Sequence, residues 1–182
     1  MSARAGQGWG HALGDTALTI LIPEADPLMR EPFPAHVSVL FPFLHESRTD
    51  AVVRRRLGEL LRGHESFELT FAEFGRYPGV LYLEPWPADP VTALTKSVVA
   101  AWPQCAPYGG IFGEDGLRPH LTLANSAAPG SGQAAAYDAL EAELAPCLPL
   151  TVTVREVTLV TWNGTAWHPT RRFGLGSGAA PG

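Results

Sequence analysis

Cysteine is scarce in this chain of 182 residues. Cys105 and Cys147 are too few for a disulfide framework, and they form no CxxC motif. The N-terminal residues are rich in glycine and alanine and contain no apolar stretch of the kind that directs secretion. We therefore expect two reduced thiols and a cytoplasmic location.

Long apolar runs and an excess of basic residues are also missing. No stretch approaches the roughly 18 apolar residues of a membrane-spanning helix, so no membrane segment is predicted. Lys96 is the single lysine, and 13 basic residues against 18 acidic ones leave a formal net charge of −5. Double-stranded DNA and long RNA are bound through extended basic surfaces, so the charge argues against both as partners. A small phosphorylated ligand needs only a few well-placed donors.

The composition that is present is typical of one globular domain. Hydrophobic residues make up 46% and charged residues 17% of the chain. Residues 1–14 and 176–182 are of low complexity, and we predict that both ends are mobile. Residues 15–175 are predicted to form a single domain, and the protein is expected to be a monomer.

Short strands and helices are predicted to alternate along this domain. Apolar and β-branched segments predict strands at residues 16–22, 36–43, 67–74, 80–83, 120–124, 150–162 (with a break near Arg155) and 166–175. Apolar residues at helical spacing predict helices at residues 51–61, 89–102 and 133–144. Modest strands and helices with hairpin turns favour an α+β fold with antiparallel sheet.

One short pattern occurs twice. The segments HVSV at residues 36–39 and HLTL at residues 120–123 each contain a histidine, an apolar residue, a hydroxyl residue and a second apolar residue. Each follows a loop that contains proline. Alternate side chains of a strand point to the same face, so each segment presents an imidazole and a hydroxyl together.

The four polar side chains of this pattern suit phosphoryl transfer. If the two strands are neighbours, His36, Ser38, His120 and Thr122 face one groove. A neutral histidine can then take a proton from the attacking oxygen while a protonated one gives a proton to the leaving oxygen. The hydroxyls can donate to the non-bridging phosphate oxygens. To bracket one phosphate, the imidazoles must lie about 5–8 Å apart.

The paired motifs resemble the two-histidine (2H) phosphoesterase superfamily, especially its branch of 2′-5′ RNA ligase-like and cyclic phosphodiesterase proteins. The segments AHVSVLFPF, GRYPGVLYLEPWP and PHLTLA and the closing strand pair are similar to segments of that branch. The similarity covers most of residues 16–175. It implies a bilobal α+β fold in which two pseudo-symmetric lobes of antiparallel sheet, with helices packed outside, surround a central groove.

The resemblance also implies an activity. Members open 2′,3′-cyclic phosphates or act on related phosphodiesters and 2′-5′ linkages without a metal or another cofactor. Carried over to this chain, His36 and His120 form the acid–base pair, and Ser38 and Thr122 bind the phosphate. The expected partner is a small cyclic phosphate, a nucleotide or a short RNA end. Asn125 departs from the pattern, because many ligase-like members have a basic residue there.

Several further residues are candidates for substrate contacts. Arg118, two residues before His120, can reach the same phosphate if the strand continues backwards. Tyr82 alternates with Leu81 and Leu83 and is expected to face the groove. Other aromatic residues could stack on a base, although such residues in strands more often belong to the core: Phe41, Tyr108 and Phe112.

Three alternatives stay open at this point. A 2′-5′ RNA ligase or phosphodiesterase acting on RNA is the nearest, and a binding module that holds a nucleotide without turnover is the second. A metal site is the third, but two histidines are few ligands and their strand partners are hydroxyls rather than carboxylates. The run Arg54-Arg55-Arg56 is most typical of a solvated helix face.

Overall fold

The computed structural model describes residues 11–111, 118–125 and 133–177. The strands are β1 (Thr16–Leu21), β2 (His36–Leu40), β3 (Phe67–Tyr77), β4 (Val80–Trp86), β5 (Leu121–Asn125), β6 (Leu150–Val154), β7 (Glu156–Trp162) and β8 (Trp167–Gly174). The α-helices are α1 (Ala51–Arg62), α2 (Asp89–Ala101) and α3 (Gln133–Leu144). Short 3-10 helices lie at Pro23–Leu28, Glu46–Arg48, Pro107–Gly110 and Ala145–Cys147. None of the helices in these ranges is long and apolar enough to span a bilayer.

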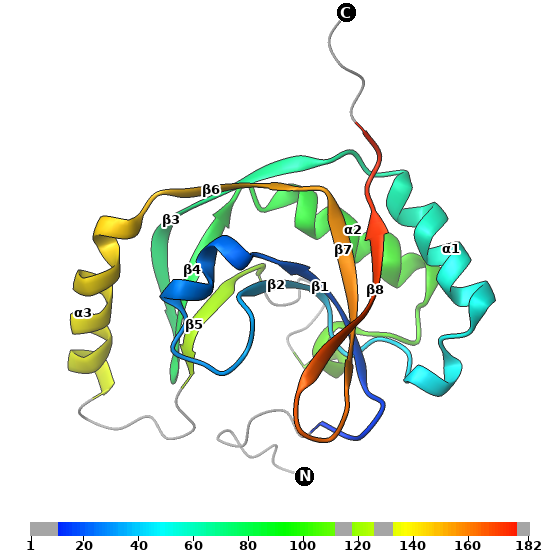
Figure 1. Cartoon of the computed structure of the whole chain (residues 1–182), viewed down its shortest axis with the longest axis horizontal. Coiled ribbons are helices and arrows are strands. Elements are labelled where there is room, and N and C mark those ends of the chain that lie inside the picture. The colour runs from blue at the N-terminus through cyan, green and yellow to red at the C-terminus, as the bar shows by residue number, and fades with distance from the viewer. Residues whose placement is uncertain (1–10, 112–117, 126–132, 178–182) are drawn as a thin grey trace, which may run out of the picture.

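The strands form one antiparallel sheet in the order β6-β3-β4-β5-β2-β1-β7-β8. Counted outward from the contact between β2 and β5, four strands lie on each side, so the two predicted lobes are the halves of a continuous sheet. Figure 1 shows the sheet curled into a half-barrel, with α1, α2 and α3 on its outside. The predicted α+β fold is confirmed.

The break predicted near Arg155 separates β6 from β7. β6 pairs with β3 at one edge of the sheet, whereas β7 pairs with β1 and β8 in the other half. Figure 1 shows the chain crossing between the halves at this point. The apolar, β-branched segment at residues 150–162 therefore contributes one strand to each half of the sheet.

The outer helices begin at local signals, and one of them is hydrogen-bonded to a motif strand. Asp50 begins α1, since its carboxylate accepts a hydrogen bond of 2.9 Å from the backbone N–H of Val53. On α2, the hydroxyl of Thr95 donates to the carbonyl of Val39 at 2.6 Å. This bond ties α2 to β2, the strand that carries the first motif.

The proline-rich segment before β2 is more ordered than a loop. It contains the 3-10 helix Pro23–Leu28, whose Asp26 carboxylate accepts a hydrogen bond of 2.7 Å from the N–H of Ala35. The N–H of Arg30 donates to the carbonyl of Leu123 at 2.8 Å. The segment is thus bonded to β5 and to Ala35, the residue directly before β2, and it forms a wall next to the motif strands.

Candidate active site

The two motif strands are neighbours in the middle of the sheet. β2 and β5 pair antiparallel, with Val37 directly opposite Leu121. Both of these apolar side chains are fully buried, so the polar residues of each motif face the other side of the sheet. In this register each histidine lies across from the hydroxyl residue of the other motif. The two histidines are diagonal neighbours, a relation in which residues are about 7–8 Å apart.

The two imidazoles are oriented in the same way. Nδ1 of His36 lies 2.8 Å from the carbonyl oxygen of Pro34, and Nδ1 of His120 lies 2.8 Å from that of Arg118. A carbonyl oxygen only accepts, so each Nδ1 carries the proton and donates it. In the neutral rings Nε2 is therefore the nitrogen with a free lone pair, and either ring can act as a base through it.

Burial lowers the pKa of both histidines. For His36 the hydrogen bond to Pro34 opposes this effect only in part. For His120 burial again dominates, the hydrogen bond to Arg118 opposes it, and the charge of His36 lowers the pKa further. The two rings therefore influence each other electrostatically, and protonation of one disfavours protonation of the other.

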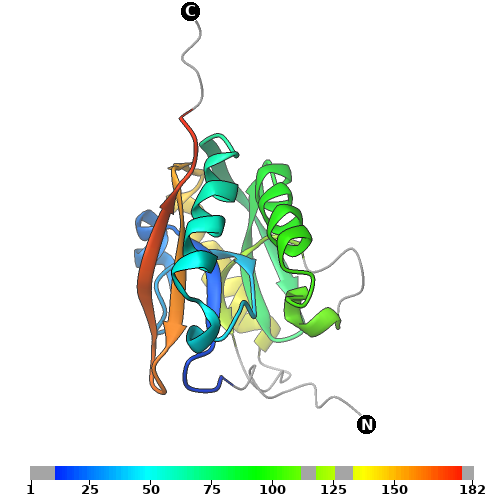
Figure 2. The same cartoon turned by 90° about the vertical axis from the view of Figure 1, so that its right-hand side faces the viewer.

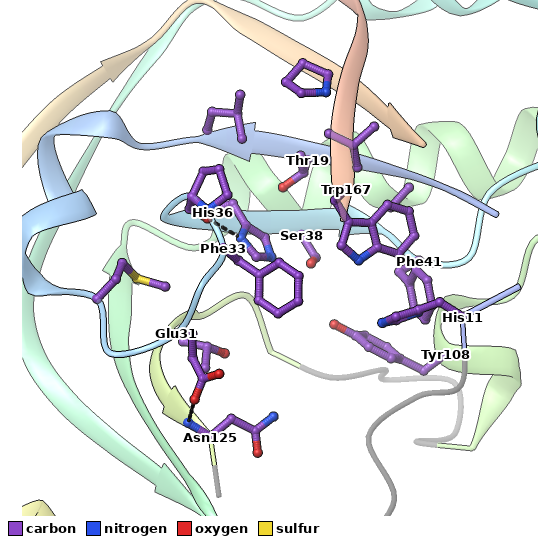
Figure 3. Close-up of a pocket in the computed structure, with 17 residues that line it drawn as sticks. His11, Thr19, Glu31, Phe33, His36, Ser38, Phe41, Tyr108, Asn125 and Trp167 are labelled. Carbon is purple, nitrogen blue, oxygen red and sulfur yellow. Dashed lines mark hydrogen bonds between the residues drawn. The ribbon is translucent and has the colours of Figure 1, made fainter. Parts of the chain in front are cut away.

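A pocket of about 210 Å³ opens at the first motif. Three of the predicted site residues line it: His36, Ser38 and Thr122. Figure 3 shows the ring of His36 and the hydroxyl of Ser38 directed into this space. Glu31 and Asn125 lie at another side of it, where the Glu31 carboxylate accepts a hydrogen bond of 2.7 Å from the Asn125 N–H.

The opposite wall of the pocket is aromatic. In Figure 3, Phe41, Tyr108, Trp167 and His11 are grouped beside Ser38. The ring centroid of His11 lies 5.0 Å from that of Trp167 and 5.7 Å from that of Phe41. His11 belongs to the segment predicted to be mobile, and sequence reasoning missed both it and Trp167. No local pattern marks them, because they meet only where the chain before β1 passes the hairpin of β7 and β8.

Tyr108 enters this wall from a strained backbone position. Its φ of 50° is in the left-handed region, where non-glycine residues are uncommon. The backbone is held there by a hydrogen bond of 2.6 Å from the Tyr108 N–H to the carbonyl of Phe41. Its hydroxyl is hydrogen-bonded to Ser38, which partly offsets the rise in the pKa of Tyr108 caused by burial. The phenol therefore stays protonated, next to a predicted phosphate-binding hydroxyl.

Tyr82 supports the second histidine. It lies opposite Thr122 in the sheet, and its ring stacks on Tyr77 with centroids 4.6 Å apart. The ring of His120 lies 5.3 Å from Tyr82. The Tyr82 ring also covers Gly75 so closely that an added Cβ there would overlap it. Tyr82 is only 8% exposed, and neither Tyr82 nor His120 lines the pocket at the first motif. A contact between Tyr82 and the substrate stays a prediction.

The remaining candidates for substrate contacts are Arg118 and Phe112. Arg118 gives its carbonyl to His120, and its exposed side chain lies near enough to lower the pKa of Tyr82, which burial raises to about 12. Arg118 does not line the pocket. Phe112 lies outside the described residues. Within the described ranges, no three His, Cys, Asp or Glu side chains gather to form a metal site, and independence from metal stays a prediction.

Comparison with known proteins gives a family and a fold. Residues 19–166 match the family model described as the 2′-5′ RNA ligase superfamily. No curated protein matches the chain. Among solved structures, TT0787 of Thermus thermophilus is similar over 90% of this chain and 98% of its own, with a TM-score of 0.61 and 17% identity. A phosphoesterase has a TM-score of 0.57 and 18% identity over 91% of this chain and 100% of its own. E. coli LigT in apo form has a TM-score of 0.54 and 19% identity over 90% and 98%.

Proposed function

The chain belongs to the 2′-5′ RNA ligase superfamily, and from this premise we propose that it is a metal-independent phosphoesterase that opens a small cyclic phosphodiester. The proposed substrate is a 2′,3′-cyclic phosphate of a nucleotide or of a short RNA end. His36 and His120 are the proposed acid–base pair, and Ser38 and Thr122 the proposed phosphate-binding residues. The observation that carries this proposal is the matched orientation of the two imidazoles on adjacent strands.

The proposed reaction follows from that orientation. One neutral histidine accepts a proton from water through Nε2 while the water oxygen forms a bond to phosphorus. The bond from phosphorus to one ribose oxygen breaks, and the second histidine, protonated, gives its Nε2 proton to that oxygen. Ser38 and Thr122 donate to the non-bridging oxygens, where negative charge increases in the transition state. The two histidines end with their protonation states exchanged, and solvent restores them.

The aromatic wall supports a nucleotide as the ligand. Phe41, Tyr108 and Trp167 of this wall line the same pocket as His36 and Ser38. A base stacked on an aromatic side chain gains about 1–3 kcal/mol. Structures of E. coli LigT, which shares the fold, are complexed with 3′-AMP, NADP+ or ATP. We propose that the base of the substrate lies on this wall while its phosphate lies at the motifs.

A substrate panel tests the proposal. The purified protein is assayed with nucleoside 2′,3′-cyclic phosphates and with 2′-5′ and 3′-5′ dinucleotides, with and without EDTA. We expect turnover of cyclic phosphates that EDTA does not change. The histidines would transfer the protons and the hydroxyls would stabilise the phosphate charge, two roles that a metal ion has in other phosphoesterases. Activity lost with EDTA and restored by a divalent ion would contradict it. Preference for 2′-5′ dinucleotides would favour the RNA ligase or phosphodiesterase alternative, and binding without turnover would favour a binding module.

The pH dependence of kcat/KM follows from the histidine pKa values. Catalysis needs one histidine neutral and the other protonated, a combination most populated between the two pKa values. Burial lowers the pKa of both His36 and His120 below the usual 6.5. The profile is therefore expected to be bell-shaped with its maximum below pH 6.5. It falls at higher pH because the acid loses its proton, and at lower pH because the base gains one. A maximum on the alkaline side of neutrality, measured from pH 4.5 to 8.5, would contradict this assignment.

A further inference from the structure

A second pocket, of about 520 Å³, lies between α1 and β8. Figure 2 shows these two elements side by side on the face turned to the viewer. Five of the residues that line this pocket are arginines: Arg54, Arg55 and Arg62 of α1, and Arg171 and Arg172 of β8. We call this pocket the arginine groove. The chain has 12 arginines in all, so the groove holds a large share of its positive charge.

Local geometry brings these arginines together. Arg54, Gly58 and Arg62 are spaced by four residues and share one face of α1. Gly58 has no side chain to fill the space above the ring of Phe173, where an added Cβ would be 3.4 Å from the ring. Gly58 and Phe173 therefore line the pocket without filling it, and the longer arginine side chains line it as well.

An irregularity in β8 directs Arg171 into the groove. Val160 of β7 pairs with Pro169, but the preceding residue, Leu159, pairs with Arg171, so Thr170 is an extra residue on β8. Pro169 consequently lines the first pocket, and Arg171 lines the arginine groove. The two pockets share β8, which is an edge strand of the sheet.

The charge of the groove is poorly compensated. Arg172 forms an exposed ion pair of 3.4 Å with Glu156. Within the described ranges no carboxylate lies within 4.0 Å of the guanidinium groups of Arg54, Arg55, Arg62 or Arg171. Like charges that converge without a partner destabilise the protein, and a bound anion removes that cost. Guanidinium groups in particular bind phosphate oxygens, because their planar donors match phosphate geometry.

The run Arg54-Arg55-Arg56 is thus divided by the fold. Arg56 is exposed, as predicted for a solvated helix face. Its guanidinium lies over the ring of Trp102, 5.0 Å from the ring centroid, and it does not line the groove. Arg54 and Arg55 line the same pocket as the arginines of β8, which are more than a hundred residues away in the sequence. The overall net charge of −5 therefore does not indicate that five arginines line one pocket.

We infer that the arginine groove binds the phosphate backbone of a single-stranded RNA whose reacting end occupies the first pocket. The inference rests on the proposed function, since it extends that substrate beyond its terminal nucleotide. Pro169 and Arg171 are two residues apart, about 7 Å along the strand. An RNA strand leaving the first pocket therefore needs only to pass the edge of β8 to reach the arginines. A hollow between a helix and a strand edge suits one nucleic acid strand better than a flat bilayer surface.

The test compares matched arginine variants in RNA binding. A fluorescent 12-nucleotide single-stranded RNA ending in a 2′,3′-cyclic phosphate is titrated with the protein, and anisotropy is recorded at several salt concentrations. The variant Arg54→Gln/Arg171→Gln is expected to bind about tenfold more weakly at low salt, as exposed charged contacts are individually modest. The slope of log K against log salt should become shallower by about 1.4, since each phosphate contact to a single strand contributes about 0.7.

Two controls separate charge from folding. Arg56→Gln removes one positive charge from the same helix, two residues from Arg54, and should bind RNA like the unaltered protein. Arg54→Lys/Arg171→Lys keeps the charge and should keep the salt slope. Equal binding by the Gln double variant and Arg56→Gln would overturn the inference, as would groove-dependent binding to phosphatidylserine vesicles without binding to RNA.

Turnover of a cyclic mononucleotide by the unaltered protein distinguishes the two proposals. If the protein turns this substrate over while the Gln double variant binds RNA normally, the groove is not an RNA site and the proposed function stands. If it turns over no substrate while RNA binding still depends on the groove, the proposed function fails and the groove remains an RNA site.

Discussion

Alanine in place of His36 or His120 is expected to lower kcat/KM for the cyclic substrate by about 10²–10⁴-fold, the usual contribution of a general acid or base. Each substitution removes an Nε2 that the Nδ1 hydrogen bond holds in the required tautomer. Binding of a non-hydrolysable phosphate ligand should change much less, because the hydroxyls of Ser38 and Thr122 remain. Steady-state kinetics and a binding titration on the same preparations provide the comparison.

The control for this experiment is His168→Ala. His168 is exposed, contacts the side-chain amide of Asn163 at 2.7 Å and does not line the first pocket. It should retain normal turnover. If both alanine variants of the motif histidines keep the turnover of the unaltered protein on every substrate, the catalytic assignment is wrong, and a nucleotide-binding module would need a different site.

Removal of either motif hydroxyl is expected to have the next largest effect. Ser38→Ala and Thr122→Ala should each lower kcat by roughly 10–10³-fold, because each removes one donor to the charge that develops on the phosphate. The loss at Ser38 also breaks its hydrogen bond to Tyr108. Single-turnover rates with saturating substrate measure the effect on chemistry separately from the effect on binding.

The variants Ser38→Thr and Thr122→Ser retain the hydroxyl and are the matched controls. Each should recover most of the activity that the alanine variant loses. Alanine and hydroxyl variants with the same rate would show that these side chains have a packing role. Thermal unfolding of all four proteins checks that the fold is retained, which is expected because both residues are half-buried on the open face of the sheet.

The local elements could be read from the sequence because their signals are local. The helix α1 begins after Asp50, as predicted, because an N-cap carboxylate needs only the next turn of its own chain. The helix Gln133–Leu144 has the predicted ends. The motif strands were predictable for a similar reason. Alternation of apolar and polar residues is a property of a single strand, and the buried Val37 and Leu121 follow it.

The surroundings of the site could not be read in the same way. Tyr108 reaches Ser38 from the 3-10 segment Pro107–Gly110, through a backbone conformation that its residue type does not favour. His11 and Trp167 meet across almost the whole length of the chain. The strand alternation of Tyr82 does not show that its ring stacks on Tyr77, covers Gly75 and lies beside His120. Each of these outcomes depends on which strands are neighbours.

By itself the sequence determined the α+β class, most element positions and the pairing of each histidine with a hydroxyl, because all of these depend on spacing within one element. Only the tertiary structure decided that β2 and β5 are adjacent, that an aromatic wall stands beside Ser38, and that arginines of α1 and β8 converge. The physical reason is that these contacts arise from strand order and from one irregular pairing at Thr170. Such pairing is set by the summed burial of the whole core. No single segment of the chain contains the information that decides it.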